Sequence, residues 1–312
     1  MGEYECYRIA LKLRSFAGTL WQADTVLGSL AWLEALREGD GGVARFLAPF
    51  AAGDPPLVLS DGFPEGLLPR PLIHRETAGA GDLASYAKQK IHRKAEFIST
   101  EDFDYIRRGK AFPNKPVTSP WVELEFLHAT INRKTGTTGG EAGNLFSTES
   151  WAITSNTEAP GTEVINIYAL CKEGWKEKLV TLFRDLSLMG FGRDKSIGMG
   201  QFEFLKMEAW QGFSNFEGAD GFIAFSSFVP AEGDPRNGNW ALNVKYGKLG
   251  ENSGSGNPFK RPFIQLKPGA VFFTGGPPKP FYGRILTSLA PSFPEAIQIC
   301  YCLAVPCIYR GG

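Results

Sequence analysis

Apolar and polar side chains alternate over several stretches of the chain, and this alternation predicts strands that bury one face. It runs through 7–15 (YRIALKLRS), 121–132 (WVELEFLHATIN) and 201–210 (QFEFLKMEAW). The apolar segment EVINIYALC (163–171) is also typical of a strand, and a glycine-rich polar segment (133–150) precedes it. We therefore expect a long hairpin between 121–132 and 163–171 with a protruding, mobile tip.

Two other segments repeat apolar residues at helical spacing. The first is 24–39, where Asp24 is a good N-cap and Gly39 a good stop. The second is 175–188, whose apolar stripe consists of Trp175, Leu179, Leu182, Phe183 and Leu186. The basic run YAKQKIHRKAEFIS (86–99) is usually a solvated helix face, and a phosphate-binding face is its alternative interpretation.

The order of these elements predicts an α+β fold. Strand, helix, strand hairpin, helix and strand follow the β-α-β-β-α-β plan of ferredoxin-like domains, which RNA-recognition domains share. Beyond Trp210 the strand patterns are 222–230, 240–249, 262–273 and 297–309. We expect tandem ferredoxin-like (RRM-like) domains, 1–210 with insertions and a degenerate, β-rich 211–312.

Composition narrows the function classes. The 33 basic and 33 acidic residues cancel, which argues against nucleic-acid binding by bulk charge and leaves room for a local basic groove. The longest apolar run, 297–309, is too short to span a membrane and contains Pro306, and residues 1–16 contain no apolar signal core. A cytoplasmic protein is expected.

Metal and cofactor chemistry is not expected. The five cysteines include no C-x-x-C pair, and none of the three histidines (His74, His92, His128) has helical metal-ligand spacing with another. We expect reduced, buried thiols, no metal and no cofactor.

The loop GFGRDKSIGMG (190–200) carries the strongest chemical signal. Its glycines allow close backbone approach to a ligand, and successive free N–H groups can bind an anion. Walker A and dinucleotide-binding loops run strand, loop, helix, whereas this loop follows a helix, whose C-terminal dipole repels phosphate. Arg193 and Lys195 must offset that dipole, with Ser196 as a further donor, and we expect Asp194 to pair with a neighbouring cation.

A loop of the form G-x-G-x-D-K-S-x-G-x-G between the second helix and the last strand resembles that of RAMP proteins, the RNA-binding subunits of CRISPR effector complexes. Further stretches are similar to one subgroup, the type III-A (Csm complex) subunit that caps the guide RNA at its 5′ end. These stretches are ADTVLGSLAW (23–32), KQKIHRKAEFISTEDFDYIRRGK (88–110), INRKTGTTGGEAGNLFSTES (131–150) and LKPGAVFF (266–273). Ala23 and Ala270 stand where Ser is usual in that subgroup.

The resemblance implies a non-catalytic clamp for the 5′ tag of the crRNA. It also implies docking to a large polymerase-like subunit and to a backbone RAMP subunit, and a thumb-like hairpin at about 131–163 near the first guide–target position. The RNA-binding residues that we expect are Arg14, Gly18, Trp21, Asn132, Arg133, Lys134, Gly190, Gly192, Arg193, Lys195, Ser196, Gly198 and Gly200. Trp21 is as well explained as a core residue as by base stacking, and we place Asn132, Arg133 and Lys134 at the base of the hairpin.

Two alternatives from other classes remain. One is a metal-independent RAMP ribonuclease that processes guide precursors, which needs a general base such as His74, His92 or His128. The other is target cleavage by an acidic residue, for which Asp24 is the nearest candidate, although an N-cap role explains it. The equivalent type III-B subunit shares the glycine loop and is an alternative within the family.

Overall fold

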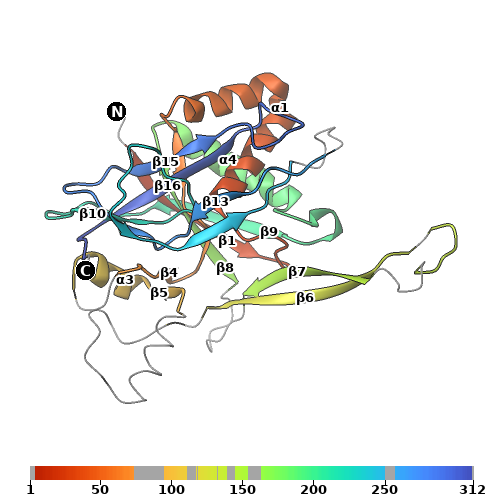
Figure 1. The fold of residues 1–312 in the computed structure, drawn as a ribbon, viewed down its shortest axis with the longest axis horizontal. Coiled ribbons are helices and arrows are strands. Elements are labelled where there is room, and N and C mark those ends of the chain that lie inside the picture. The colour runs from red at the N-terminus through yellow and green to blue at the C-terminus, as the bar shows by residue number, and fades with distance from the viewer. Residues whose placement is uncertain are drawn as a thin grey trace, which may run out of the picture.

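The computed structural model describes residues 4–73, 95–110, 117, 119–131, 133–138, 145–153, 163–249 and 257–310. Figure 1 shows a body of packed helices and sheets, and a long hairpin that extends away from it. No helix in these ranges is long and apolar enough to cross a membrane.

The first sheet has the strand order β2-β8-β1-β9. Its strands are β1 (Glu5–Leu13), β2 (Leu57–Leu59), β8 (Val164–Cys171) and β9 (Phe202–Ala209), and the short β3 (Phe63–Pro64) also pairs with β8. All the pairings are antiparallel. Counted along the chain, the four main strands lie in the order 2-3-1-4, which is compatible with a ferredoxin-like sheet.

Two helices connect these strands and pack against each other. Helix α1 (Ala23–Ala51) is longer than expected, and Gly39 with φ of 65° forms a kink where the stop was predicted. Asp24 is not the N-cap: Gln22 occupies that position, and Asp24 lies one residue inside the helix. Helix α4 (Trp175–Met189) matches the predicted helix and buries Leu179, Leu182, Phe183 and Leu186.

The protruding hairpin is formed by different strands from those predicted. Strand β6 (Trp121–Ala129) pairs with β7 (Leu145–Ile153), from Trp121 opposite Ile153 to Ala129 opposite Leu145. Strand β8 instead lies inside the first sheet, because its nearly continuous run of apolar residues is buried on both faces. Part of the expected tip, residues 139–144, lies outside the described residues.

A small subdomain lies beside the first sheet. It consists of β4 (Leu67–Pro69), β5 (Phe97–Ser99) and α3 (Thr100–Arg107), which Ser99 caps by accepting a hydrogen bond from the Asp102 N–H. The basic run 86–99 therefore ends in a strand rather than in a helix, and its residues 86–94 lie outside the described part of the chain.

The second sheet has the strand order β11-β14-β10-β16-β15. Its strands are β10 (Gly221–Ala224), β11 (Gly238–Asn239), β14 (Val271–Phe273), β15 (Phe281–Leu286) and β16 (Gln298–Cys307). Strands β12 (Leu242–Lys245) and β13 (Phe263–Leu266) form a separate pair. The predicted strand 262–273 is thus two strands, because Gly269 turns the chain with φ of 89° between them.

The two sheets share one hydrophobic core. Strand β16 packs against α1, β2 and β8, and the buried residues Tyr301, Leu303 and Val305 belong to the same apolar cluster as Ile9 and Leu30. The relative position of the two sheets is therefore set by packing rather than by a linker.

Candidate nucleic-acid interface

The two ends of the glycine loop 190–200 are hydrogen-bonded to each other. Gly190, Gly192, Gly198 and Gly200 all have positive φ, as does Asp194 at 61°. The Phe191 N–H donates to the Gly200 carbonyl over 2.9 Å, which joins the two ends of the loop. Lys195–Ile197 form a single 3₁₀ turn at the outer end. The glycines are needed here because other residues reach positive φ only with strain.

The loop is fastened to the turn that follows β1. The Gly200 N–H donates to the Phe16 carbonyl over 2.7 Å, and the Arg193 N–H donates to Thr19 Oγ1 over 3.0 Å. Gly18 is needed for this contact, because a Cβ atom there would lie 2.6 Å from the Arg193 carbonyl oxygen. Two segments about 170 residues apart in the chain therefore form one surface.

The base of the β6–β7 hairpin joins the same surface. Ala17 and Trp151 exchange main-chain hydrogen bonds of 2.8 and 2.9 Å. The Arg193 guanidinium donates to the Glu149 carbonyl. The turn after β1, the glycine loop and the hairpin base are thus held together by direct contacts.

Cationic groups face outward from this surface. Arg193 pairs with Asp194 over 3.1 Å, which confirms the expected role of Asp194, and its side chain is 44% exposed. Arg14 pairs with Glu203, and both side chains are about half exposed. Among the described residues, Lys195 has neither an ion-pair nor a hydrogen-bond partner for its ammonium group. Within the described residues, the surface therefore offers one uncommitted cation, Lys195, and one, Arg14, whose exposed ion pair stabilises the fold little. Arg193 adds a third positive charge and also holds the hairpin base through Glu149.

Solved structures with a similar fold come from CRISPR effector assemblies. A chain of the crystal structure of the Csm1-Csm4 cassette in complex with cA4 has a TM-score of 0.63 and 15% identity, covering 98% of this chain and 99% of that one. A chain of the Csm1-Csm4 cassette in complex with AMPPNP has a TM-score of 0.62 and 16% identity. The match covers 98% of this chain and 100% of that one. A chain of the Csm3-Csm4 subcomplex in the type III-A CRISPR-Cas interference complex has a TM-score of 0.60 and 13% identity. The match covers 97% of this chain and 99% of that one. The chain has the fold of a Csm subunit.

These similarities confirm the resemblance to the RAMP proteins of Csm complexes at the level of the fold, over nearly the whole chain. Csm4 is the subunit that the three assemblies have in common. No family model and no curated protein matches the sequence.

Trp21 does not offer a stacking face to a ligand in this Csm fold. Its side chain is 2% exposed and stacks on Phe191, with ring centroids 4.0 Å apart, so it supports the glycine loop from beneath. Phe16, in the same turn, is 42% exposed and contacts Phe126 of the hairpin. Sequence reasoning missed Phe16 because the larger ring of Trp21 was the more obvious candidate.

Arg133 and Lys134 lie at the opposite end of the hairpin from the one predicted. They follow the far end of β6, beyond Ala129, whereas the base of the hairpin is at Trp151 and Ala17. Both are exposed. Asn132 lies outside the described residues. The positive charge near the hairpin base comes from Arg193 instead.

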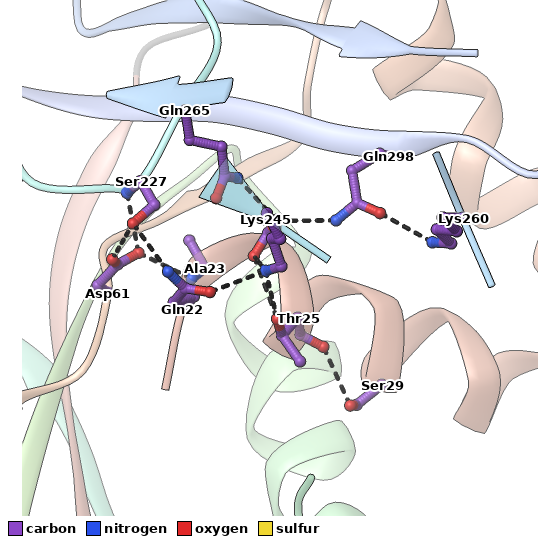
Figure 2. A network of polar contacts seen from close by, with 11 residues as sticks. Gln22, Ala23, Thr25, Ser29, Asp61, Ser227, Lys245, Lys260, Gln265 and Gln298 are labelled. Carbon is purple, nitrogen blue, oxygen red and sulfur yellow. Dashed lines mark hydrogen bonds and ion pairs between the residues drawn. The ribbon is translucent and has the colours of Figure 1, made fainter. Parts of the chain in front are cut away.

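Asp24 is bound in a buried polar network with Lys245, Gln265 and Gln298, whose side chains are labelled in Figure 2. Lys245 Nζ pairs with Asp24 Oδ1, while the Gln265 and Gln298 amides donate to Oδ2 over 2.9 and 2.8 Å. The Asp24 side chain is fully buried and that of Lys245 is 14% exposed. Asp24 therefore anchors the second half of the chain to the start of α1, and its carboxylate is not open to an RNA strand.

A second buried carboxylate lies beside this network. Asp61 Oδ1 accepts from the Ala23 N–H over 2.9 Å and from the Ser227 N–H over 3.0 Å, and Oδ2 accepts from Ser227 Oγ over 2.7 Å. Burial raises the pKa of Asp61 to about 6, against the opposing effect of these hydrogen bonds. Asp61, rather than Asp24, is the carboxylate that satisfies an N–H at the start of α1.

The other candidate chemical groups are placed as follows. His128 lies on the hairpin, where its Nε2 is 2.8 Å from Thr148 Oγ1 and its ring stacks on Phe146, while His74 and His92 lie outside the described residues. All five thiols are free, and burial raises the pKa of the Cys302 thiol to about 12. Within the described ranges, no group of three or more His, Cys, Asp or Glu side chains could hold a metal ion.

Proposed function

We propose that the chain is a non-catalytic RNA-binding subunit of a type III-A Csm complex and that it holds the single-stranded 5′ tag of the crRNA. The observation that carries this proposal is the fastening of the glycine loop to the turn after β1 and to the hairpin base. This fastening gives a rigid surface with Arg193, Lys195 and Ser196 on its outer side and Phe16 at its edge.

The chemistry of this surface suits single-stranded RNA. Proteins bind such strands with cations that follow the phosphates and flat side chains that stack on bases. Lys195 is uncommitted among the described residues, and Arg14 exchanges a solvent-exposed carboxylate for a phosphate at small cost. Arg193, whose guanidinium also donates to the Glu149 carbonyl, adds positive charge beside them. Phe16 takes the stacking role that the sequence suggested for Trp21.

The partners follow from the proteins that share the fold. The matched chains come from assemblies of Csm4 with Csm1 and with Csm3. We infer that this chain bridges the large polymerase-like subunit and a backbone RAMP subunit, as a pair of ferredoxin-like domains divided near residue 210. The β6–β7 hairpin is its thumb, positioned near the first guide–target pair.

A nuclease role receives no support from Asp24. A carboxylate that cleaves RNA must reach the scissile phosphodiester or an attacking water, whereas both Asp24 oxygens accept hydrogen bonds within the network. Asp24 is better explained as a structural anchor.

The experiment that tests the proposal is RNA binding by the Arg193→Ala/Lys195→Ala variant. We expect the affinity for a tag-bearing crRNA to fall about tenfold or more, irrespective of base sequence, because phosphates carry no sequence information. The slope of log K against log salt should become shallower by about 1.4, since each phosphate contact on a single strand contributes about 0.7.

The matched control is Arg45→Ala/Lys176→Ala, which removes the same charge from exposed positions on α1 and α4. Retention of crRNA at moderate salt should be unchanged in this variant. If the loop variant and the control retain equal amounts of RNA, the loop is not the RNA-binding element and the proposal fails.

A further inference from the structure

The β12–β13 pair has its polar and apolar faces the opposite way round from an ordinary surface hairpin. Residues alternate strictly along β12, with Asn243 and Lys245 toward the body and Leu242 and Val244 exposed. A two-stranded sheet normally turns its apolar face inward, because burial of apolar surface is what stabilises it. Here the apolar face is the outer one.

The inner face is held by the buried network described above. Lys245 contacts Asp24, Gln22 and Thr25, and Gln265 of β13 donates to Asp24 (Figure 2). These contacts tie both strands to the start of α1. Leu266 at the end of β13 is buried in a core cluster with Phe228, and the network holds the rest of the pair. Leu242, Val244 and Ile264 are left exposed and are presented in a defined orientation.

The outer face carries several exposed apolar and aromatic side chains. Val244 and Ile264 are directly opposite each other across the pair and are 49% and 58% exposed. Leu242 and Tyr246 extend this face along the chain at 56% and 78%. Exposed apolar side chains gathered in this way mark interaction sites rather than ordinary surface.

The charged residues in the described parts of the two segments that contain this pair all have one sign. The described residues of 238–249 and 257–268 contain five basic residues and no acidic residue. Lys245 and Lys260 turn inward to the network, where Lys260 donates to Gln298. Lys248, Arg261 and Lys267 remain exposed. The surface thus has an apolar centre and a positive rim.

We propose that the outer face of β12–β13 is a docking surface for a protein subunit that presents an apolar patch bordered by acidic side chains. Leu242, Val244 and Ile264 occupy the centre, where aliphatic side chains bury well against protein. Tyr246 adds a flat ring only at the end of this face, whereas a nucleobase would need such a ring at its centre. The positive rim is complementary to acidic side chains and sets the orientation of the partner. The residues of this surface are different from those of the glycine-loop surface, and it is used for assembly rather than for RNA.

The choice of partner rests on the proposed function, because the probes are the Csm1-type and Csm3-type subunits of the same complex. The test compares the wild-type chain with Val244→Glu/Ile264→Glu, and a Val244→Thr/Ile264→Thr variant keeps β-branched side chains in case the glutamates disturb folding. Leu188→Glu is the matched control, because Leu188 is 84% exposed on α4. Binding of each purified subunit is measured by calorimetry, and crRNA affinity is measured for each variant alone.

We expect both double variants to weaken binding of one of the two subunits, by tenfold or more for the glutamate pair. The Leu188→Glu control should bind as wild type, and crRNA affinity should stay within twofold of wild type for every variant. Lys248→Glu/Arg261→Glu should weaken binding of the same subunit. The difference in affinity between this variant and the wild type should become smaller at high salt.

Two results would overturn this inference and leave the proposed function standing. One is unchanged binding of both subunits by the double variants, and the other is a loss of crRNA affinity with subunit binding intact. In the second case the face belongs to the RNA surface. If the wild-type chain binds neither subunit, the proposed function fails together with the inference.

Discussion

Gly200 lies against the main chain of Phe191 so closely that a Cβ atom at residue 200 would be 1.9 Å from the Phe191 carbonyl oxygen. The same two residues are joined by the hydrogen bond that closes the glycine loop. Phe191 in turn stacks on the buried Trp21. The form of the proposed RNA-binding surface therefore depends on a contact between two main-chain segments that only glycine allows.

Gly200→Ala should destabilise the protein by roughly 3 kcal/mol or more, because the clash is with main-chain atoms and φ is also positive. Gly198→Ala is the matched control: φ is 94° there, but a Cβ atom would meet nothing within 4 Å. It should cost only the backbone strain, about 1–2 kcal/mol. Denaturant unfolding measures both, and equal losses would contradict the close contact.

Phe16→Ala and Trp21→Ala should separate binding from stability. Trp21→Ala removes a buried ring and should cost about 3–5 kcal/mol of folding free energy. Phe16 is 42% exposed, so its removal should cost under about 1 kcal/mol of stability. It should weaken crRNA binding by about 1–3 kcal/mol if a base stacks on it. Normal crRNA affinity in Phe16→Ala would refute the stacking role.

Asp24→Ala should destabilise the fold by about 3–5 kcal/mol, because it leaves the Lys245 ammonium buried without its counter-charge. Asp24→Asn/Lys245→Met removes both charges and should recover most of that loss. Arg45→Ala, which breaks the exposed pair with Glu38, should cost less than about 1 kcal/mol. If the double variant is as unstable as Asp24→Ala, the network does not act through charge pairing.

Asp61 should make the protein more stable as the pH falls from above 6 to about 4. Its pKa in the fold, about 6, exceeds the ordinary aspartate value of 3.8, so the folded state binds the proton more tightly than the unfolded state does. Protonation of Asp61 should raise the free energy of unfolding by roughly 3 kcal/mol. Asp61→Asn mimics the protonated acid and should remove this gain.

Unfolding free energies at pH 4, 5, 6 and 7 for wild type and Asp61→Asn measure the effect, because other carboxylates titrate alike in both proteins. The difference between the two proteins should favour Asp61→Asn at pH 7 and diminish toward pH 4. A pH-independent difference would show that Asp61 does not titrate in this range.

The strand β1, the helix α4, the strand β9 and the glycine loop could be predicted because their signals are local. Alternation, a helical stripe and a set of glycines are properties of consecutive residues, and short-range geometry turns them into elements. The kink at Gly39 also follows from a local signal, because glycine tolerates the positive φ found there.

Strand pairing was predicted wrongly because it is not local. Segments 145–153 and 163–171 both follow β6, and alternation does not say which of them is its partner. The nearly unbroken apolar run of β8 was the available signal, since a strand buried on both faces belongs inside a sheet and not on a protruding hairpin. The misplacement of Arg133 and Lys134 at the hairpin base follows directly from that error.

By itself the sequence determined the local elements, the glycine loop with its charges and the resemblance to the RAMP proteins of Csm complexes. Tertiary structure decided which side chains those elements expose and which they bury. Trp21 packs beneath the glycine loop, and Phe16 is exposed beside it. The hydrogen-bond partners of Asp24 lie 221, 241 and 274 residues away in the chain. The physical reason is that the burial of a side chain and the pairing of its charge depend on atoms brought close by packing, whose distance along the chain is unrelated to their distance in space.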